Sequence, residues 1–363
     1  MHSGRTPERL TKRSLVAVSH AIERAALATA EDGPLVVLAL FQRPPYFARE
    51  RAVYERIAAR ATVTVVGMVG PSPAQLPPGT YGVALDEAEE LAREWSVVAL
   101  TPRFGATLVA YDRGEVAPAA TLESGRLFDG RWGFRRDEAL HEVLRLRERL
   151  AERLPAPARA GLDETIARVR DIPAGPGESR AEAAIRMLAV RGERAHRPEP
   201  ADASAGLLDE PGLRRWTGMD GVTAPGTLPV ALVAVRVDEP AGAPERFGRR
   251  SAAREGQAVL AAVTAVLRPV DRAVRLTDNE FLLILPALAE REALTVVGRL
   301  HEAIGGLARS YPFVAFSVHA AVTVTTRRPL PVAEVRHAVE WAVREGVPVA
   351  TLAPENAATA GSR

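Results

Sequence analysis

The first third of the chain alternates between short apolar runs and amphipathic segments. Leu15, Val18 and Ile22 recur at helical spacing, which predicts a helix near the start. Two β-branched runs, at residues 34–41 and 62–69, are typical of buried strands. The other elements that the pattern predicts are a helix at 47–61, a helix at 85–95 and two strands within 96–114. This alternation predicts an α/β domain that closes near Trp132.

A strongly charged helix is predicted from Asp137 onward. Its apolar positions recur every three or four residues, as in a helix that packs on another element or on a second copy of the chain: Leu140, Val143, Leu146, Leu150 and Leu154. Stretches rich in proline, alanine and glycine follow, and the most linker-like of them is 195–206. We therefore expect a first domain over residues 1–135 and a helical connector over 136–225, with the domain boundary within 196–225.

The remaining pattern predicts a second domain over residues 226–354 and a disordered tail at 355–363. Its expected elements, in order, are a strand at 228–238, a helix at 251–268, a β-hairpin at 271–286, a helix at 290–308, a strand at 313–325, a helix at 331–346 and a short strand at 348–352. Apart from the last helix and strand, this is the β-α-β-β-α-β order of ferredoxin-like folds. The expected fold class is thus α/β for the first domain and α+β for the second.

Composition narrows the function classes. The chain has 363 residues, of which 47% are hydrophobic, and its net charge is only +2. The pI of 9.3 does not indicate nucleic acid, because Lys12 is the only lysine and arginine, which does not titrate, supplies the other positive charges. The absence of cysteine excludes disulfides and thiolate metal sites, and the apolar runs are too short to cross a bilayer. We expect a cytoplasmic protein without a cofactor, a membrane segment or a nucleic-acid partner.

The predicted hairpin carries a motif that resembles a known enzyme family. Arg275-Leu276-Thr277-Asp278-Asn279-Glu280-Phe281 stands where the family has RxGGDEF, and a hydrophobic strand follows it. Residues 228–352 therefore resemble the GGDEF family of diguanylate cyclases, which join two GTP molecules into cyclic di-GMP. The order of the predicted elements agrees with that family throughout.

The resemblance places the two metal-binding carboxylates of the family at Arg236 and Asn279, while Asp238 keeps a neighbouring carboxylate. Cations bridge the triphosphate and neutralise the charge that develops there, so the reaction depends on these carboxylates. A guanidinium about 4 Å from the site would oppose even a unit positive charge by roughly 4 kcal/mol in a medium of effective dielectric constant about 20. We expect the site to reject magnesium and the domain to lack cyclase activity.

Other positions of the family's site also differ. Thr277 and Asp278 replace two glycines that let the backbone approach the phosphates. Gln257 stands at the guanine-contacting aspartate, and Val343 lies near the position of a lysine in the last helix. Loss of several such groups predicts a non-catalytic domain. The Thr277 to Asn279 segment is then a structural turn, since Asp and Asn favour tight hairpins.

Arg268 and Asp271 form an RxxD motif shortly before the hairpin. In the family this motif binds the product at an inhibitory site, so the resemblance makes both residues candidates for cyclic di-GMP binding. The forked donors of arginine and the oxygens of aspartate suit phosphate and guanine. In the alternative interpretation both residues are structural, because an arginine that ends a helix and an aspartate that starts a strand are favoured by themselves.

The first domain resembles the DICT sensory domain over residues 14–129. The resemblance rests on Tyr54 and on the segments 14–23, 36–47, 92–100 and 104–112. It implies a small sensory module, with an unknown ligand, placed upstream of an output domain.

A ligand pocket is predicted in this first domain. Its candidate residues are a polar pair one helical turn apart and four aromatic residues: His20, Glu23, Phe41, Phe47, Tyr54 and Trp95. The alternative is that the aromatic residues belong to the core. No cysteine is present for a covalent bilin, and no His, Cys and Asp cluster has metal-ligand spacing along the chain. We therefore expect a small molecule bound non-covalently and no metal site.

Three functions remain open. The favoured hypothesis is a non-catalytic signalling protein, in which a DICT-like input domain biases a degenerate GGDEF-like domain through the connector within a homodimer. An active diguanylate cyclase is the enzyme alternative, and it would need substitutes for Arg236 and Asn279. The third hypothesis is a dimerisation or interaction scaffold whose GGDEF-like fold only presents a surface.

Overall fold

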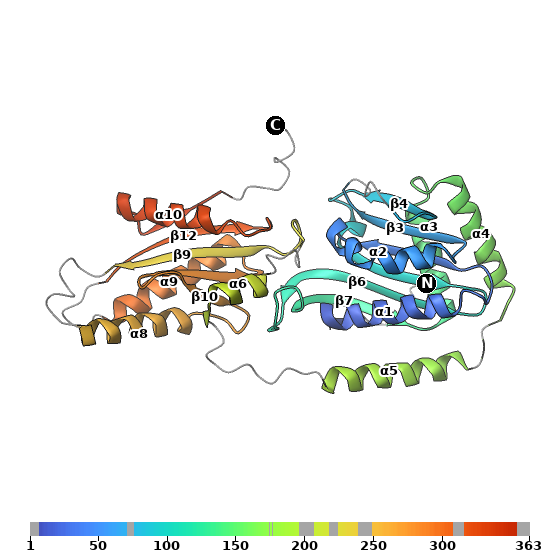
Figure 1. Ribbon diagram of the computed structural model, residues 1–363, viewed down its shortest axis with the longest axis horizontal. Coiled ribbons are helices and arrows are strands. Elements are labelled where there is room, and N and C mark those ends of the chain that lie inside the picture. Colours follow the sequence, from blue (N-terminus) through green and yellow to red (C-terminus); the bar gives the residue numbers. More distant parts are fainter. Residues whose placement is uncertain are drawn as a thin grey trace. The chain divides into compact units, whose positions relative to one another are not determined.

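The computed structural model describes residues 7–70, 76–173, 175, 177–195, 207–217, 224–238, 249–307 and 316–353. The predicted tail and nearly all of the predicted linker at 195–206 lie outside these residues. The chain divides into two compact units, drawn in Figure 1. Residues 1–113 and 126–197 form the first unit, and residues 114–125 and 198–363 form the second.

Seven strands form one sheet in the first unit, in the order β1-β7-β6-β5-β2-β3-β4. The strands are β1 (Glu8–Thr11), β2 (Val36–Phe41), β3 (Val63–Val69), β4 (Thr80–Leu85), β5 (Glu94–Leu100), β6 (Gly105–Val116) and β7 (Arg126–Gly133). β2, β3 and β4 run parallel, whereas β5 is antiparallel to both β2 and β6. The central strands β2, β3 and β5 are buried along their whole length, as expected of strands that are covered on both faces.

Helices cover both faces of this sheet (Figure 1). They are α1 (Lys12–Ala28) and α2 (Pro44–Ala58) on one face and α3 (Arg136–Arg149) and α4 (Ala156–Arg170) on the other. Successive side chains of a strand point to opposite faces, and β2 shows this division. Leu38 lies in the apolar core beneath α3 and α4, whereas the ring of Phe41 contacts Phe47 and Tyr54 of α2. The predicted α/β layering is confirmed.

The start of α1 follows directly from the sequence. Thr11 is the N-cap residue, and its Oγ1 accepts a hydrogen bond of 3.3 Å from the backbone N–H of Ser14. Leu15, Ile22 and Ala26 are fully buried, so the helical spacing of apolar residues marks the face that packs on the sheet.

The charged helix that we assigned to a connector belongs to the first unit. Val143 and Leu146 of α3, together with Leu150 and Leu154 just beyond its end, are buried in the same core as the strands. Leu162 of α4 joins them. The leucine spacing therefore reflects packing on the sheet within one chain, and the predicted boundary at residue 135 was too early. α5 (Glu178–Ala195) follows these two helices.

The helix predicted at 85–95 was wrong. Only a short 3₁₀ turn forms there, η1 (Glu90–Arg93), and Glu94 and Trp95 already belong to β5. Glu94 is fully buried and stands opposite Tyr111 of β6. Glu94, a good helix former, thus joins a strand because the sheet offers its backbone and side chain partners. The strands β1, β4 and β7 were not predicted.

Six strands form one sheet in the second unit, in the order β13-β12-β9-β11-β10-β8. They are β8 (Leu207–Leu208), β9 (Val230–Asp238), β10 (Arg272–Arg275), β11 (Glu280–Pro286), β12 (Ser317–Thr325) and β13 (Val349–Thr351). The four central strands β12, β9, β11 and β10 pair antiparallel. Their order and their connections are those of a ferredoxin-like fold, which confirms the expected class.

Two apolar cores flank this second sheet. One lies between the sheet and α8 (Arg249–Ala265) with α9 (Glu290–Leu307), and the other lies beneath α6 (Glu210–Thr217) and α10 (Val332–Glu345). Successive side chains of β11 pack in opposite cores: Leu283 lies in the first and Leu282 in the second. The short last strand β13 runs parallel to β12.

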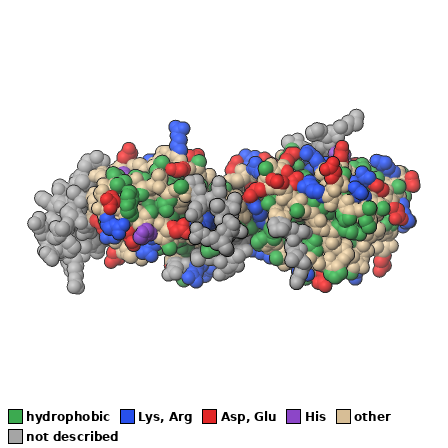
Figure 2. All heavy atoms as spheres, turned by 90° about the horizontal axis from the view of Figure 1, so that it is seen from above, with side chains coloured by type: hydrophobic (Ala, Val, Ile, Leu, Met, Phe, Trp, Pro, Cys, Tyr) green, Lys and Arg blue, Asp and Glu red, His purple; other side chains and the backbone are tan. Residues whose placement is uncertain are grey.

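Charged side chains of both signs are interspersed over the face drawn in Figure 2. Among the described residues, no helix combines the length and the apolar character needed to cross a membrane.

Candidate functional site

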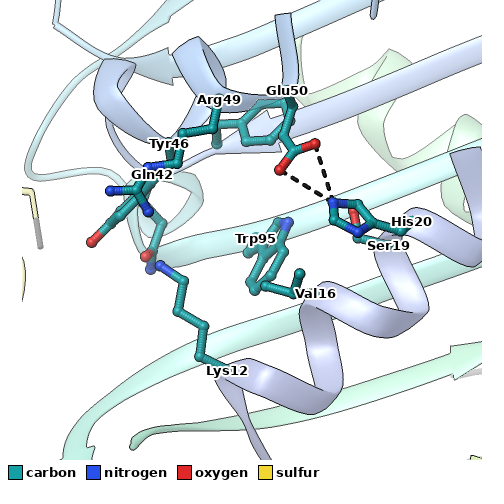
Figure 3. A pocket seen from close by; sticks show the side chains of 10 residues that line it. Lys12, Val16, Ser19, His20, Gln42, Tyr46, Arg49, Glu50 and Trp95 are labelled. Carbon is teal, nitrogen blue, oxygen red and sulfur yellow. Dashed lines mark hydrogen bonds and ion pairs between the residues drawn. The ribbon is translucent and has the colours of Figure 1, made fainter. Parts of the chain in front are cut away.

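A small pocket opens in the first unit between α1, α2 and the sheet (Figure 3). It has a volume of about 70 Å³. Its walls come from α1, from the end of β2, from α2 and from β5, and they consist of Lys12, Val16, Ser19, His20, Phe41, Gln42, Tyr46, Arg49, Glu50 and Trp95. Pockets that hold drug-sized ligands have volumes of roughly 300 Å³ or more. This pocket is much smaller, so it suits only a small ligand.

One end of this pocket holds an imidazole and two carboxyl groups. Nε2 of His20 lies 3.2 Å from each carboxylate oxygen of Glu50. Glu23 lies one turn after His20 on α1, and one potential ligand atom from each of the three residues falls within 4.8 Å of the others. We call His20, Glu23 and Glu50 the His–Glu–Glu cluster.

Glu23 is the buried member of the cluster, with 2% of its surface exposed. Burial and the neighbouring Glu50 carboxylate raise the pKa of Glu23 to about 7, although His20 and a hydrogen bond from Ser19 act in the opposite direction. The Ser19 hydroxyl donates to Oε1 of Glu23 at 3.1 Å. Near neutral pH this carboxyl is therefore poised between its protonated and charged forms.

Two buried donors lie near the cluster. The hydroxyl of Tyr54, a residue with no exposed surface, interacts with the Glu23 carboxyl without a hydrogen bond of ordinary length, whereas Nε1 of Trp95 has no hydrogen-bond partner in the described part of the chain. Burial and the charge of the adjacent Glu23 raise the pKa of Tyr54, so the phenol stays protonated and able to donate. The Trp95 ring is 9% exposed and lines the pocket. Its indole nitrogen points toward Glu50 and His20 in Figure 3.

The opposite end of the pocket carries positive charge. Nζ of Lys12 lies 3.6 Å from the ring centroid of Tyr46, within the range of a cation–π interaction. The Tyr46 hydroxyl in turn accepts a 2.7 Å hydrogen bond from Nη1 of Arg126, whose side chain is fully buried. Arg126 is also ion-paired with Asp112. The pocket is thus polar at both ends, and Trp95 separates Lys12 from His20 (Figure 3).

Three of the predicted sensory residues, His20, Phe41 and Trp95, line the pocket, and Glu23 belongs to the His–Glu–Glu cluster at its end. Phe47 and Tyr54 instead form an edge-to-face cluster with Phe41, with ring centroids 5.4 to 5.8 Å apart, as core residues do. The pocket residues that sequence reasoning missed are Lys12, Val16, Ser19, Gln42, Tyr46, Arg49 and Glu50. Helical spacing on α2 could have placed Tyr46, Arg49 and Glu50 on one face.

In the second unit, Arg236 and Asn279 stand where the GGDEF resemblance places metal-binding carboxylates, and both bond to Asp238. Nε of Arg236 donates to both oxygens of Asp238, at 3.0 and 3.1 Å. Nδ2 of Asn279 donates to the same Asp238 at 2.8 Å. The three residues come from the end of β9 and the β10–β11 turn, which adjacent strands bring together.

The rest of the hairpin motif also bonds within the chain. Arg275 donates from Nη2 to Oδ1 of the fully exposed Asp278 at 2.9 Å, and the Thr277 hydroxyl donates to Oδ1 of Asn279 at 2.9 Å. Glu280 stands opposite Arg236 in the sheet and accepts two hydrogen bonds from Arg336 of α10, at 2.9 and 3.0 Å. Phe281 is buried in the core on the α8 and α9 side. These contacts agree with a structural turn.

Arg268 and Asp271 are brought together, but they bind each other. Asp271 has no exposed surface, and its carboxylate accepts bonds from the backbone N–H of Arg268 and from its guanidinium, the shortest at 2.8 Å. A further 2.7 Å bond links Nη2 of Arg268 to the carbonyl of Pro286. This geometry fits the structural interpretation, and binding of cyclic di-GMP there stays a prediction. Gln257 is exposed on α8, and Val343 is half-buried on α10.

Three comparisons with known proteins bear on this chain. Residues 2–113 match the DICT family, described as a sensory domain in diguanylate cyclases and two-component systems. No curated protein matches the sequence.

Several solved structures are similar to part of the chain. The GGDEF domain of YfiN, or TpbB, from Pseudomonas aeruginosa is 16% identical, over 34% of this chain and 83% of that one, with a TM-score of 0.31. The GGDEF domain of DgcB from Caulobacter crescentus in complex with c-di-GMP is 18% identical, over 43% and 94%, with a TM-score of 0.30. The diguanylate cyclase SiaD with its activator SiaC, from Pseudomonas aeruginosa, is 20% identical, over 60% and 79%, with a TM-score of 0.32.

The strand order and connections of the second unit show its ferredoxin-like fold. Its hairpin retains the Arg275, Glu280 and Phe281 positions of the GGDEF motif. The match at residues 2–113 confirms the DICT resemblance of the first unit, although it starts and ends earlier than the expected 14–129. The chain thus joins a segment that matches the DICT sensory domain to a unit with a ferredoxin-like fold, whose hairpin resembles the GGDEF motif.

Proposed function

We propose that this protein is a non-catalytic signalling regulator, in which the DICT domain receives a signal and the GGDEF-like domain passes it on without making cyclic di-GMP. The observation that carries the proposal is that the Asp238 carboxylate already accepts hydrogen bonds from two side chains. Arg236 and Asn279 both donate to it, and neither can offer a carboxylate oxygen to a cation.

Charge supports the same proposal. The guanidinium of Arg236 carries a positive charge. A magnesium ion that approached Asp238 would meet this charge within a few ångströms, and the repulsion would outweigh what one remaining carboxylate contributes. Glu280, an acidic side chain of the hairpin near this point, is held by Arg336.

The output would then be an interaction of the GGDEF-like domain with another protein or with a second copy of the chain. Loss of metal ligands leaves the hydrophobic cores of the fold complete, so the domain can keep its shape without the reaction. We propose a homodimer as the working state, which light scattering of the purified chain would show as a mass of twice 38.9 kDa.

Incubation of the full chain with GTP and magnesium tests the proposal. We expect no cyclic di-GMP above the level of a reaction without protein, in manganese as well as in magnesium. Asp238→Asn is the matched variant, because it removes the surviving carboxylate and keeps the side-chain size. Product that forms with the natural chain and disappears with Asp238→Asn would overturn the proposal.

A further inference from the structure

The His–Glu–Glu cluster gathers three potential metal ligands at the end of an open pocket. His20 and Glu23 lie one turn apart on α1, and Glu50 reaches them from α2, thirty residues later in the sequence. His20 and Glu50 line the pocket, and their side chains are 36% and 24% exposed, so an ion can reach them from solvent. Glu23 closes the cluster from the buried side.

The separations in the cluster fit a metal ion. Bonds from zinc to nitrogen or oxygen are about 2.1 Å long and the ligands are arranged tetrahedrally, so two ligand atoms on one ion lie about 3.4 Å apart. The imidazole nitrogen of His20 is 3.2 Å from Glu50, close to this value. The three ligand atoms lie within 4.8 Å of one another, so small side-chain rotations bring all of them into range.

Charge balance also favours a cation in the cluster. When Glu23 and Glu50 are both ionised they carry two negative charges, which one divalent ion neutralises. Without it, Glu23 and Glu50 can be charged together only against mutual repulsion in a partly buried site.

The surroundings are equipped to hold the ligands once they bind an ion. The Ser19 hydroxyl already donates to Glu23, and the Tyr54 hydroxyl lies beside the same carboxyl and interacts with it. Hydrogen bonds of this kind orient metal-binding carboxylates. The unpartnered Nε1 of Trp95 faces the pocket side of the cluster, where it can donate to a water or to an anion on the ion.

We propose that His20, Glu23 and Glu50 bind a divalent transition-metal ion, with a coordination position open to the pocket beside Trp95. One imidazole and two carboxylates suit zinc, manganese or iron better than calcium, which takes six or more oxygen ligands. The ion is then the ligand that the DICT domain binds, or the anchor for a small anion in the pocket. The site lies in the first unit and does not depend on the proposed lack of cyclase activity.

Titration of the purified full chain with zinc, after removal of bound metal by a chelator, tests the site. We expect one equivalent of zinc to bind by calorimetry, and cobalt to give the visible absorption spectrum of a site with one nitrogen and two carboxylate ligands. Glu50→Gln keeps the size of a half-exposed side chain and should fold. This variant and His20→Ala should each bind zinc at least about tenfold more weakly, because each loses a direct ligand.

His337→Ala is the matched control. His337 also lies near a glutamate, with Nδ1 at 3.8 Å from Glu340, but the pair is exposed and has no third ligand among the described residues. Its replacement should leave zinc binding unchanged. The proposal is overturned if the natural chain binds no zinc, or if Glu50→Gln binds it as the natural chain does. A cyclase assay reports on the other unit, so either proposal can fail alone.

Discussion

Nδ2 of Asn279 lies 2.8 Å from Oδ1 of Asp238, which stands 41 positions earlier in the sequence. β9 and β11 are neighbouring antiparallel strands, and this pairing carries the turn residue Asn279 to the end of β9. Arg236 approaches the same carboxylate along β9 itself. The polar ends of the two strands are therefore tied together by side chains at the place where a cyclase would hold its cations.

We expect magnesium to bind beside Asp238 only after both Arg236 and Asn279 are replaced by aspartate. Asn279→Asp alone leaves Arg236 to pair with the added carboxylate, so we expect no magnesium-dependent change in melting temperature. Arg236→Asp combined with Asn279→Asp sets three carboxylates together, which should lower the melting temperature in chelator and restore it in millimolar magnesium. Thermal melts with and without magnesium measure this. A magnesium shift in the natural chain would contradict the expectation.

Arg268→Ala should lower the stability of the second unit. Asp271 would stay buried without the guanidinium that it now binds, and we expect a loss of about 1–3 kcal/mol in the free energy of unfolding of the second unit. Chemical denaturation measures the loss, and Arg268→Lys should recover part of it. Calorimetric titration of the natural chain with cyclic di-GMP separates the two interpretations, and the absence of saturable heat would favour the structural one. Saturable binding that Arg268→Ala abolishes would favour the receptor hypothesis instead.

Glu23 should make the stability of the first unit depend on pH. Its pKa is about 7 in the folded chain against 4.5 for the free group, so the folded state holds the proton more tightly. The resulting stabilisation is complete below about pH 4.5 and is lost as the pH rises through 7. In buffer with a chelator, the melting temperature should therefore fall between pH 5 and pH 8. Glu23→Gln should flatten this fall, while the groups that face it, His20, Glu50 and Tyr54, remain.

Gly105→Ala should destabilise the first unit. An added Cβ would lie 2.4 Å from Cα of Arg136 and 2.9 Å from Cβ of Ala139, so the start of α3 would have to move away from the sheet. Overpacking of this kind costs about 1–3 kcal/mol. Calorimetry of the full chain measures the effect. Gly298→Ala is the control, because its Cβ meets nothing within 4 Å and helix propensity favours alanine.

Periodic patterns predicted most of the fold. The β-branched runs became β2 and β3, and the second unit followed its predicted order from β9 to β13. β7 was missed although its buried residues alternate strictly over most of its length, which is a period-two signal. The segment 85–95 misled because its last two residues, Glu94 and Trp95, pair in β5, and only a 3₁₀ turn precedes them.

The candidate site was harder to predict, because it depends on contacts between elements. His20 and Glu23 were found through their spacing on one helix. Glu50 was missed, because no spacing rule links it to residues on α1 until the two helices are packed together. The Arg236 and Asn279 replacements were visible in the sequence, whereas their shared contact with Asp238 depends on the strand register.

The packing of α3 and α4 on the first sheet decides how the sensory part can be studied alone. A fragment that stops at residue 113, where the family match ends, would leave Leu38, Val65 and Val98 of the sheet without the helices that cover them. Such a fragment would present a broad apolar surface to water and tend to aggregate. A fragment that continues through Arg170 keeps both covering helices. We expect this fragment, which is still shorter than the full chain, to fold by itself.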